Sequence, residues 1–468
     1  MVIRKVQLQK RILILGFGSI GQAILPLLFR HLIFQPEQIT IISKDNEGLK
    51  IAQQFQVNFH HQTITEENYY EILGGFLQEG DFLLNLSLGV SSVDLIKLCQ
   101  EKGALYLDTC SEPWDGIYLD GSIAPALRTN YALREEVLKL KDKAKKTAVI
   151  THGANPGLVS HFVKQALLNM ANDTGIAMSR LETATDWAEL AHRLEIKSIH
   201  IAEHDTQTTR QPKKSEEFVN TWSVDGLISE GLQPAELGWG THERHWPRDA
   251  EQHKFGPKCA IYLKRPGAAT LVRTWTPLGG ACHGFLITHA EAISLANYLT
   301  LQDDQGVYYR PTVHYAYNPC PDAVLSLYEL SGNYFEAQEK KRLIVDEVME
   351  GIDELGVLLM GNSKGAYWYG SQLSIQTARD FVPYNNATSL QVASGTLAGV
   401  LWALEHPDCG IVEPEDLDYR YVLDIAEPYL GNLGGYYTDW TPLQKRSELF
   451  AEAIDHSDPW QFLNIRVN

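Results

Sequence analysis

Short apolar runs alternate with helical stretches over the first third of the chain. The apolar runs predict strands at residues 12–15, 39–43, 57–60, 82–87, 104–109 and 147–150. The residues between them predict helices, for example at 93–102 and 131–143. Strands that alternate with helices are typical of a doubly wound parallel sheet, which binds ligands at the carboxyl ends of its strands. We therefore predict an α/β fold whose residues 1–154 form a Rossmann-type domain.

The pattern changes after residue 154. Runs rich in Thr, Trp, Tyr and Val are joined by short helices, and strands no longer alternate with helices. This pattern favours an α+β domain on a mixed or antiparallel sheet, which we expect to carry catalysis and dimerisation over residues 155–468. The last sixty or so residues are acidic and aromatic, and we expect them to pack on either domain or on a partner subunit.

A glycine fingerprint follows the first predicted strand. Gly16, Gly18 and Gly21 have the spacing G-x-G-x-x-G, with Ser19 and Ile20 between the last two. In such a unit the glycines allow a tight turn, a close approach of a pyrophosphate, and packing of helix on strand. The first N–H groups of the helix then face the phosphates. A tight turn without a ligand is the alternative, but the position directly after a strand favours a dinucleotide site.

Polar residues after later strands are expected to face the same crevice. We predict that the dinucleotide also contacts Asn85, Ser87, Asp108, Thr109, Gly153, Ala154 and Asn155. Asn155 precedes Pro156 and Gly157, so it could simply cap a helix. Its amide could instead hydrogen-bond a nicotinamide carboxamide or a substrate amine.

The end of the second predicted strand bears on the choice of cofactor. An acidic residue there usually binds the adenosine ribose diol, as in NAD-binding proteins. This strand ends in Ser43 and Lys44, and the nearest carboxylate is that of Asp45. Asp45 could take this role, so the strand end leaves NAD and NADP open.

Composition and charge narrow the classes of partner. The chain has 58 acidic residues against 40 Lys plus Arg, for a formal net charge of −18. Such a field repels nucleic acid and anionic membranes and attracts cations, so it indicates either simple solubility or a cationic substrate. No apolar run is long enough for a membrane span, and the amino terminus lacks a signal-peptide pattern. Six scattered cysteines predict neither disulfides nor a zinc site, which favours the cytoplasm.

Carboxylates and aromatic residues recur together in the second predicted domain. They are Glu203, Trp222, Glu230, Glu236, Trp239, His289 and Glu291. Carboxylates and an indole face suit an alkylammonium ligand, although any one Trp could be a core residue. His289 and Glu291 alternate on a possible strand, where they could form a base with its orienting carboxylate or, less well, a metal pair. We predict no metal, and hydride chemistry is the default because the chain lacks nucleophile-elbow, Walker and H-E-x-x-H motifs.

Nearly the whole chain resembles the bacterial homospermidine synthases. The matching segments are 16–21, 108–114, 130–134, 153–157, 200–203, 220–224, 229–240, 309–317, 353–359, 367–374 and 458–462. This resemblance implies a homodimer that holds NAD and acts on putrescine and spermidine. Putrescine would be oxidised to an imine, a second putrescine would displace ammonia, and reduction would give homospermidine with no net oxidation. Spermidine could take part by releasing 1,3-diaminopropane.

The resemblance also implies roles for individual residues. Asn155 would contact both nicotinamide and substrate, Glu203 would lie closest to the amine chemistry, and Trp222 would stack on the cationic reaction centre. Glu112 and Glu230 would be carboxylates of the amine sites or of the entrance, and His289, Glu291 and Asp353 would complete the pocket.

Two other functions stay open at this stage. A saccharopine or carboxynorspermidine dehydrogenase would catalyse net oxidation or reduction and, in the saccharopine case, would need basic residues for a substrate carboxylate. A dinucleotide-binding sensor or scaffold would bind NAD without turnover.

Overall fold

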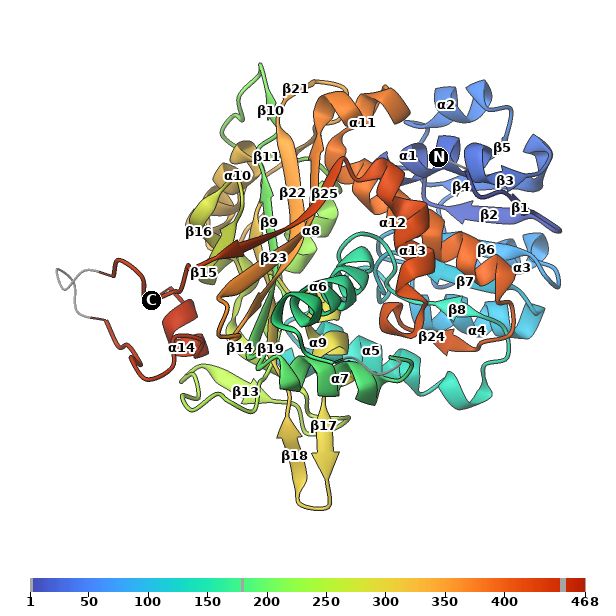
Figure 1. The fold of residues 1–468 in the computed structure, drawn as a ribbon. Helices are drawn as coiled ribbons and strands as arrows, with labels where there is room; N and C mark the ends of the chain where they lie inside the picture. Colours follow the sequence, from blue (N-terminus) through green and yellow to red (C-terminus); the bar gives the residue numbers. More distant parts are fainter. Residues whose placement is uncertain (1–2, 178–180, 447–451, 468) are drawn as a thin grey trace.

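The protein is built from two sheets with helices around and between them (Figure 1). The computed structural model describes residues 3–177, 181–446 and 452–467. The larger sheet and the smaller sheet lie side by side, and helices α6 (Leu158–Thr174), α12 (Ala387–Glu405) and α13 (Tyr419–Ala426) lie between them.

The first sheet is seven-stranded and fully parallel, as the sequence predicts. Its order is β24 (Ile411–Val412), β8 (Ala148–Val149), β7 (Leu105–Asp108), β6 (Phe82–Asn85), β2 (Ile12–Leu15), β4 (Ile39–Ser43) and β5 (Asn58–His61). The strand order reverses at β2, which places the glycine fingerprint at the topological switch point where such sheets bind ligands. The seventh strand, β24, comes from far beyond residue 154, so the later chain completes this sheet.

The helices of this domain are α1 (Ser19–His31), α2 (Leu49–Gln54), α3 (Tyr69–Phe76), α4 (Ser92–Lys102) and α5 (Asn130–Leu138). The predicted helix at 131–143 is too long, because α5 ends at Leu138 and only a 3-10 turn, η4 (Lys141–Lys143), follows. Residues 141–143 are exposed, so no buried face holds them in a continued helix.

The second sheet is ten-stranded and mixed, again as predicted. Its main path runs β13 (Ala250–Gln252), β14 (Ala260–Pro266), β12 (Pro234–Gly238), β19 (Thr312–Asn318), β9 (Ser198–Asp205), β22 (Ile352–Met360), β23 (Ala366–Ser374) and β25 (Asn432–Thr438). The hairpin β15 (Leu271–Thr276) and β16 (Gly280–Phe285) joins it through β19. Strands β19 and β9 are parallel and lie at the centre, where they carry Tyr315, Tyr317 and Glu203.

Shorter elements complete the fold. The helices are α7 (Ala184–Arg193), α8 (Val224–Leu232), α9 (Ala290–Tyr298), α10 (Pro321–Gly332), α11 (Ile375–Phe381) and α14 (Phe462–Ile465). The small strand pairs are β1 (Val6–Gln7) with β3 (Leu32–Ile33), β10 (Thr208–Thr209) with β21 (Val348–Glu350), β11 (Glu217–Asn220) with β20 (Lys340–Leu343), and β17 (Leu301–Asp303) with β18 (Gly306–Tyr309).

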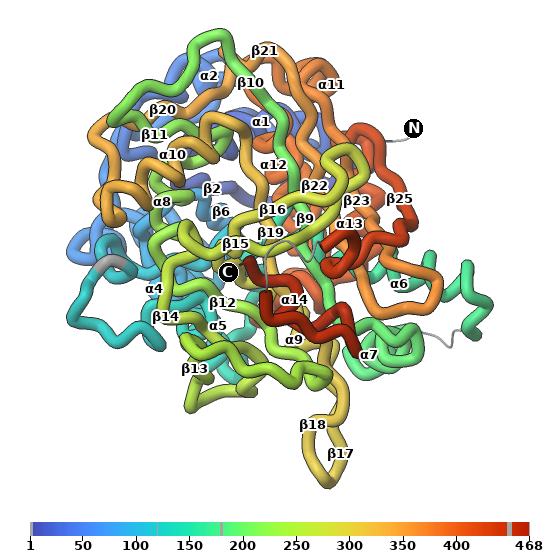
Figure 2. The backbone as a smooth tube through the Cα atoms, turned by 90° about the vertical axis from the view of Figure 1, so that its left-hand side faces the viewer, coloured from blue at the N-terminus to red at the C-terminus, as the bar shows by residue number. Residues whose placement is uncertain are grey.

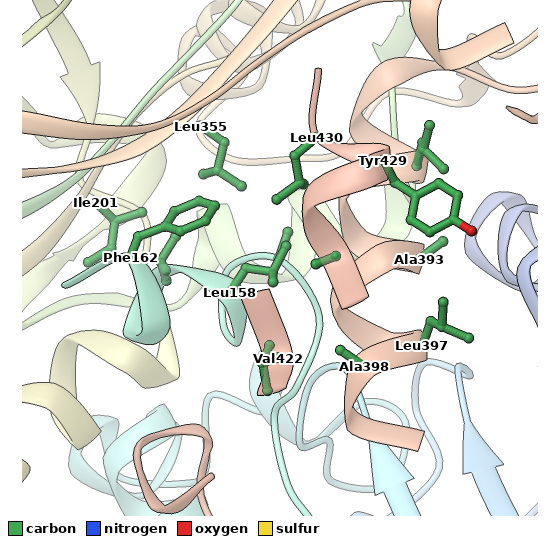
Figure 3. Close-up of a cluster of buried hydrophobic side chains, with 14 of the residues drawn as sticks. Leu158, Phe162, Ile201, Leu355, Ala393, Leu397, Ala398, Val422, Tyr429 and Leu430 are labelled. Carbon is green, nitrogen blue, oxygen red and sulfur yellow. The ribbon is translucent and has the colours of Figure 1, made fainter. Parts of the chain in front are cut away.

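Helix α12 joins the cores of the two sheets. Its residues Ala393, Leu397 and Ala398 are buried in one hydrophobic cluster with residues of α6, β9, β22 and α13 (Figure 3). The same helix packs against α1 of the first domain. Among the described helices it alone is long and apolar enough to cross a membrane, but 89% of its most apolar window is buried inside the protein. It therefore holds the two sheets together as a core helix.

The carboxyl-terminal segment lies on the second sheet. Phe462 and Ile465 of α14 pack on β12 and β15, and Val467 N–H donates to Leu271 (Figure 2). Trp440 and Trp460 cover Trp368 on the face that points away from α6 and α9. Of the last sixty residues, β24 packs with the first domain and these aromatic residues pack with the second.

A buried ion pair between distant parts of the chain should contribute strongly to stability. Arg134 on α5 donates to both carboxylate oxygens of Glu413 at 2.6 and 2.7 Å, and its side chain is 5% exposed. Arg134→Met should lower the free energy of unfolding by about 3 kcal/mol, because it leaves a buried carboxylate unpaired. The exposed pair of Arg4 with Glu405 is the control, and Arg4→Met should cost less than about 1 kcal/mol. Equal losses in urea unfolding would contradict this role for Arg134.

Candidate functional site

A cavity of about 900 Å³ lies where the carboxyl ends of the parallel strands face the second domain. One wall is formed by the glycine-rich turn and by the loops after β4, β6 and β7. The other wall is formed by β9, β19, α8 and the start of α9. The predicted cofactor residues and the predicted amine residues therefore face one space.

The glycine-rich turn fits a dinucleotide. Gly16 has a positive φ of 87°, and a Cβ there would lie 2.8 Å from the backbone of Leu86 and Ser87. A Cβ on Gly21 would lie 2.9 Å from the Phe17 ring, so this glycine allows close packing of the helix. A Cβ on Gly18, in contrast, would meet no protein atom within 4 Å. Gly18 thus borders open space at the uncapped amino terminus of α1, where a pyrophosphate would bind.

Other predicted cofactor residues also line the cavity. They are Ser19, Ile20, Asp45, Ser87, Thr109, Gly153, Ala154 and Asn155. At the ribose end, Ser43 and Lys44 join Asp45, whose Oδ1 accepts a hydrogen bond from Glu47 N–H at 3.0 Å. The structure thus places all three candidate residues at the end of β4.

Asn85 and Asp108 differ from the other predicted cofactor residues, because neither lines the cavity. Asn85 Oδ1 accepts hydrogen bonds from the backbone and the hydroxyl of Ser87. Asp108 is fully buried, where it accepts from Thr151 N–H at 2.6 Å and from the Tyr106 hydroxyl at 2.9 Å. Burial raises the pKa of Asp108. Both residues lie behind the wall and hold the loops that form it.

Glu203 lies at the centre of the opposite wall. One of its oxygens, Oε2, accepts from Asn155 Nδ2 at 3.0 Å and from the Tyr315 hydroxyl at 2.5 Å. Its side chain is buried, and this burial raises the pKa of Glu203 to about 8 against the opposing effect of these hydrogen bonds. A carboxylate with such a pKa can accept and return a proton near neutral pH.

Trp222 lies between β11 and α8 and presents its indole to the cavity. Its Nε1 donates to the Tyr317 hydroxyl at 2.9 Å, and Tyr317 stacks on Tyr315 with ring centroids 5.0 Å apart. A Cβ on Gly226 would lie 2.8 Å from the indole, so this glycine makes room for the ring. The indole is thereby fixed on the same aromatic stack that holds Glu203.

His289 carries a positive charge between two carboxylates. Its Nε2 lies 3.1 Å from Glu230 and its Nδ1 lies 3.2 Å from Glu291. Burial alone would lower the pKa of His289, but Glu291 and Glu230 together raise it to about 10. The predicted strand at this point is wrong, because His289 caps α9 and Glu291 lies in its first turn. The two side chains still meet, with Glu291 buried behind His289 rather than on the cavity wall.

Glu112 forms a second acidic group near Glu230. Burial and the nearby Glu230 charge raise the pKa of Glu112 to about 8. The Cys110 thiol lies 3.7 Å from the Glu112 carboxylate. Glu112 and Glu230 therefore add a second acidic group to the cavity wall besides Glu203.

Three further residues of the predicted acidic and aromatic set lie off the cavity wall. Asp353 is fully buried and accepts a hydrogen bond from Thr388, which does line the cavity. Glu236 accepts from Asn130 N–H at 2.8 Å and so binds the start of α5. Trp239 packs in a separate core cluster, with its ring centroid 5.4 Å from that of Trp246. The sequence could not separate these structural acids and indoles from those of the cavity.

Sequence reasoning also missed residues. It assigned no role to Tyr315, Tyr317, Asp205 or Thr388, although Tyr315 and Tyr317 lie in a segment that carries the resemblance. The alternation of Tyr315 and Tyr317 on β19 was the signal available, because both side chains point to the same face as Glu203.

The charges of the cavity are strongly unequal. The acidic residues that line it are Asp45, Glu47, Glu112, Asp115, Glu203, Asp225 and Glu230. The only described lysines on its walls are Lys44 and Lys341, and no described arginine lines it. Lys341 already pairs with Asp225. The cavity therefore suits a cationic ligand beside a dinucleotide.

Gly18 and Gly21 should respond differently to the same substitution. Gly18→Ala should reduce NAD affinity at least tenfold in calorimetric titration while changing stability by less than about 0.5 kcal/mol, because its Cβ would enter the space of the pyrophosphate. Gly21→Ala should instead lower the melting temperature, because its Cβ collides with Phe17 and the Gly16 carbonyl. Undiminished NAD binding by Gly18→Ala would contradict the placement of the pyrophosphate.

Comparison with known proteins gives consistent matches over the whole chain. Residues 12–151 match the saccharopine dehydrogenase NADP binding domain, and residues 153–439 match the saccharopine dehydrogenase C-terminal domain. Homospermidine synthase of Mesorhizobium japonicum is 51% identical, with 97% of this chain and 96% of that protein covered. Homospermidine synthase of Blastochloris viridis is 52% identical, with 97% of each covered.

A solved structure shares both the sequence and the fold. Homospermidine synthase of Legionella pneumophila, crystallised in complex with NAD, is 60% identical to this chain, with a TM-score of 0.94 and 99% of each chain covered. These matches agree with the two sheets and with the acidic cavity beside the glycine-rich turn. The chain belongs to the homospermidine synthase family, within the saccharopine dehydrogenase-like proteins.

Proposed function

We propose that the protein is an NAD-dependent homospermidine synthase. It transfers an aminobutyl group between two molecules of putrescine, which gives homospermidine and ammonia. Spermidine can replace one putrescine with release of 1,3-diaminopropane. The observation that carries this proposal is an acidic cavity, with an indole and a buried carboxylate on one wall and a glycine-rich dinucleotide turn on the other.

The residues of the first wall would hold the cofactor. The backbone at Gly16, Gly18 and Ser19 would bind the pyrophosphate, and Asp45 the adenosine ribose. NAD, when bound, supplies hydride transfer, first as acceptor and then as donor. The relative of known structure was crystallised with NAD, which supports NAD over NADP. Asn155 would lie between the nicotinamide and the substrate.

The second wall would handle the amines. Glu203 would take a proton from the reacting ammonium, because an amine must be neutral before its carbon can give up a hydride. Its second oxygen, Oε1, is free of the hydrogen bonds that Oε2 accepts from Asn155 and Tyr315, so it can face the substrate.

The remaining residues would bind and stabilise positive charge. The Trp222 face would stabilise the cationic carbon centre, since cation–π attraction grows when water is excluded. Glu112 and Glu230 would bind the distant ammonium, and Glu291 would keep His289 protonated and in place.

The charge of the side chains that line the cavity favours this function over that of a saccharopine dehydrogenase. That enzyme class must bind a substrate carboxylate, which calls for basic side chains near the reacting carbon. Of the two described lysines that line the cavity, Lys44 directly follows β4 and Lys341 is paired with Asp225. A sensor without turnover has no need of a carboxylate whose pKa is near neutral beside the nicotinamide site.

We further propose a cytoplasmic homodimer that binds neither nucleic acid nor membranes. The net charge of −18 disfavours both kinds of partner. The six cysteines are all free, which fits a reducing compartment. The resemblance to the homospermidine synthases is the support for the dimer.

Product analysis tests the proposed function directly. Purified protein incubated with putrescine and NAD should form homospermidine and ammonia in equal amounts, because the hydride removed from one amine is returned to the next. Chromatography of the polyamines and absorbance of NADH in solution would measure both. Stoichiometric accumulation of NADH would indicate a dehydrogenase, and NAD binding without any product would indicate a sensor.

Substitution of Trp222 should lower activity, whereas substitution of Trp239 should lower stability. Trp222→Ala should lower kcat about thirtyfold, the equivalent of about 2 kcal/mol of cation–π stabilisation in the transition state. Trp239→Ala should instead lower the free energy of unfolding by about 3 kcal/mol, since its indole lies in a core cluster, with kcat unchanged in the folded protein. If Trp222→Ala lost stability and activity together, the indole would be a structural residue only.

A further inference from the structure

Two buried aspartates lie directly behind Glu203. Asp205 on β9 and Asp353 on β22 are opposite each other in the antiparallel register, and they are 2% and 0% exposed. Residues in this position have Cβ atoms about 5 Å apart. Glu203 is two residues before Asp205 on the same face of β9, so three carboxylates occupy one buried patch.

The hydrogen bonds of this pair are asymmetric. Both carboxylate oxygens of Asp205 accept hydrogen bonds, one from Gln207 N–H at 2.8 Å and the other from the Thr221 hydroxyl at 3.0 Å. Asp353 Oδ2 accepts only from Thr388, and Asp353 Oδ1 has no partner among the described residues. Such an orphaned, buried carboxylate oxygen is costly when charged and much less so when protonated.

Among the described basic residues, His204 offsets part of the charge of this pair, because it lowers the pKa of Asp205 against the effect of burial. The other titratable groups around the pair are Glu203, Tyr317 of β19 and Cys320 at the start of α10. His204 and Glu354 lie on the opposite face of the sheet, where Glu354 is held by Thr276, Leu278 and Gln372. Burial and the charges of Glu203 and Asp205 raise the pKa of Asp353, while burial raises that of Asp205 only to about 6.

We propose that Asp205 and Asp353 share one proton in the free site, and that binding of a diamine to Glu203 releases it. Two carboxylates this close in a buried site cannot both ionise without a cation. An ammonium group bound at Glu203 would supply that cation, since Thr388, which donates to Asp353, lines the cavity. The two aspartates thus lose their shared proton when the positive charge of the substrate arrives at Glu203. They act through Glu203 and do not touch the reacting atoms. This inference rests on the proposed diamine substrate.

The proton balance makes this exchange useful. Each substrate ammonium must lose one proton before reaction, and ammonia and the new secondary amine each regain one at the end. Two protons are therefore held by the protein between these steps, whereas Glu203 can hold one. Once substrate binding has deprotonated the Asp205–Asp353 pair, the pair can accept the second of these protons and later return it to the product.

Calorimetry in buffers of different ionisation enthalpy tests the exchange without turnover. Protein loaded with NADH, which cannot accept a hydride, is titrated with putrescine at pH 7. Wild type should release about one more proton per diamine than Asp353→Asn, because the hydrogen bonds from Gln207 and Thr221 keep the remaining Asp205 ionised. Asp205→Asn leaves the buried Asp353 beside Glu203 and should lower the release by less. Glu354→Gln changes the neighbouring carboxylate on the opposite face of β22 and should keep the wild-type release. Equal release in all four proteins would overturn the proposal.

Infrared spectroscopy gives a second readout that does not depend on the substrate. Wild type with ¹³C-labelled aspartate should show a protonated-carboxyl band at pH 7 that Asp353→Asn loses, Asp205→Asn alters and Glu354→Gln retains. A band unchanged by Asp353→Asn and Asp205→Asn would overturn the shared proton. If putrescine did not bind, the proposed function would be contradicted instead. The infrared band would still show whether Asp205 and Asp353 share a proton. A raised KM with an unchanged proton release in Asp353→Asn would make Asp353 a direct ammonium ligand.

Discussion

The walls of the cavity bury carboxylates with few basic side chains to neutralise them. Glu203, Glu112, Asp205 and Asp353 all lie in a medium where an ionised group loses most of its hydration. His289 acts on the charge of Glu203, and it is already shared between Glu230 and Glu291. The site therefore has more acidic side chains than basic ones. In our proposal, bound protons reduce this negative charge when no substrate is present, and the ammonium groups of the diamine balance it when substrate is bound.

Contacts outside the cavity hold its two walls together. Helix α12 packs on α1 of the first domain and shares a core with α6, β9 and β22 of the second. Glu236 of β12 binds the start of α5, and Arg134 of α5 binds Glu413. The dinucleotide turn and the acidic wall are thus held in a fixed relation by contacts outside the cavity.

Aromatic residues set the geometry of the acids. Tyr315 donates to Glu203, Tyr317 stacks on Tyr315, and the Trp222 indole donates to Tyr317. This arrangement directs one oxygen of Glu203 to the protein and leaves the other for the substrate. Because the indole and the carboxylate are tied to one stack, the charge-stabilising face and the proton acceptor keep a constant separation.

The parallel sheet, the glycine turn and the residue types of the site could all be predicted from the order of residues along the chain. These features depend on local periodicity and on fixed spacings, which the chain carries wherever it folds. The seventh strand β24 could not be predicted, because two residues pair with β8 only after a separation of some 260 positions. The predicted strand at His289 and Glu291 was wrong for a related reason, since a buried helix start and a short strand share the same apolar pattern.

Which acids and indoles lie together in the cavity depends on how the two sheets pack. Glu236 and Trp239 have the same chemistry as Glu203 and Trp222, but one binds a helix start and the other packs in a core. The pairing of Asp205 with Asp353 depends on the register of β9 and β22, which long-range packing sets. Burial, and with it the proton affinity of each carboxylate, is a property of the assembled walls, so no residue type or spacing could reveal it.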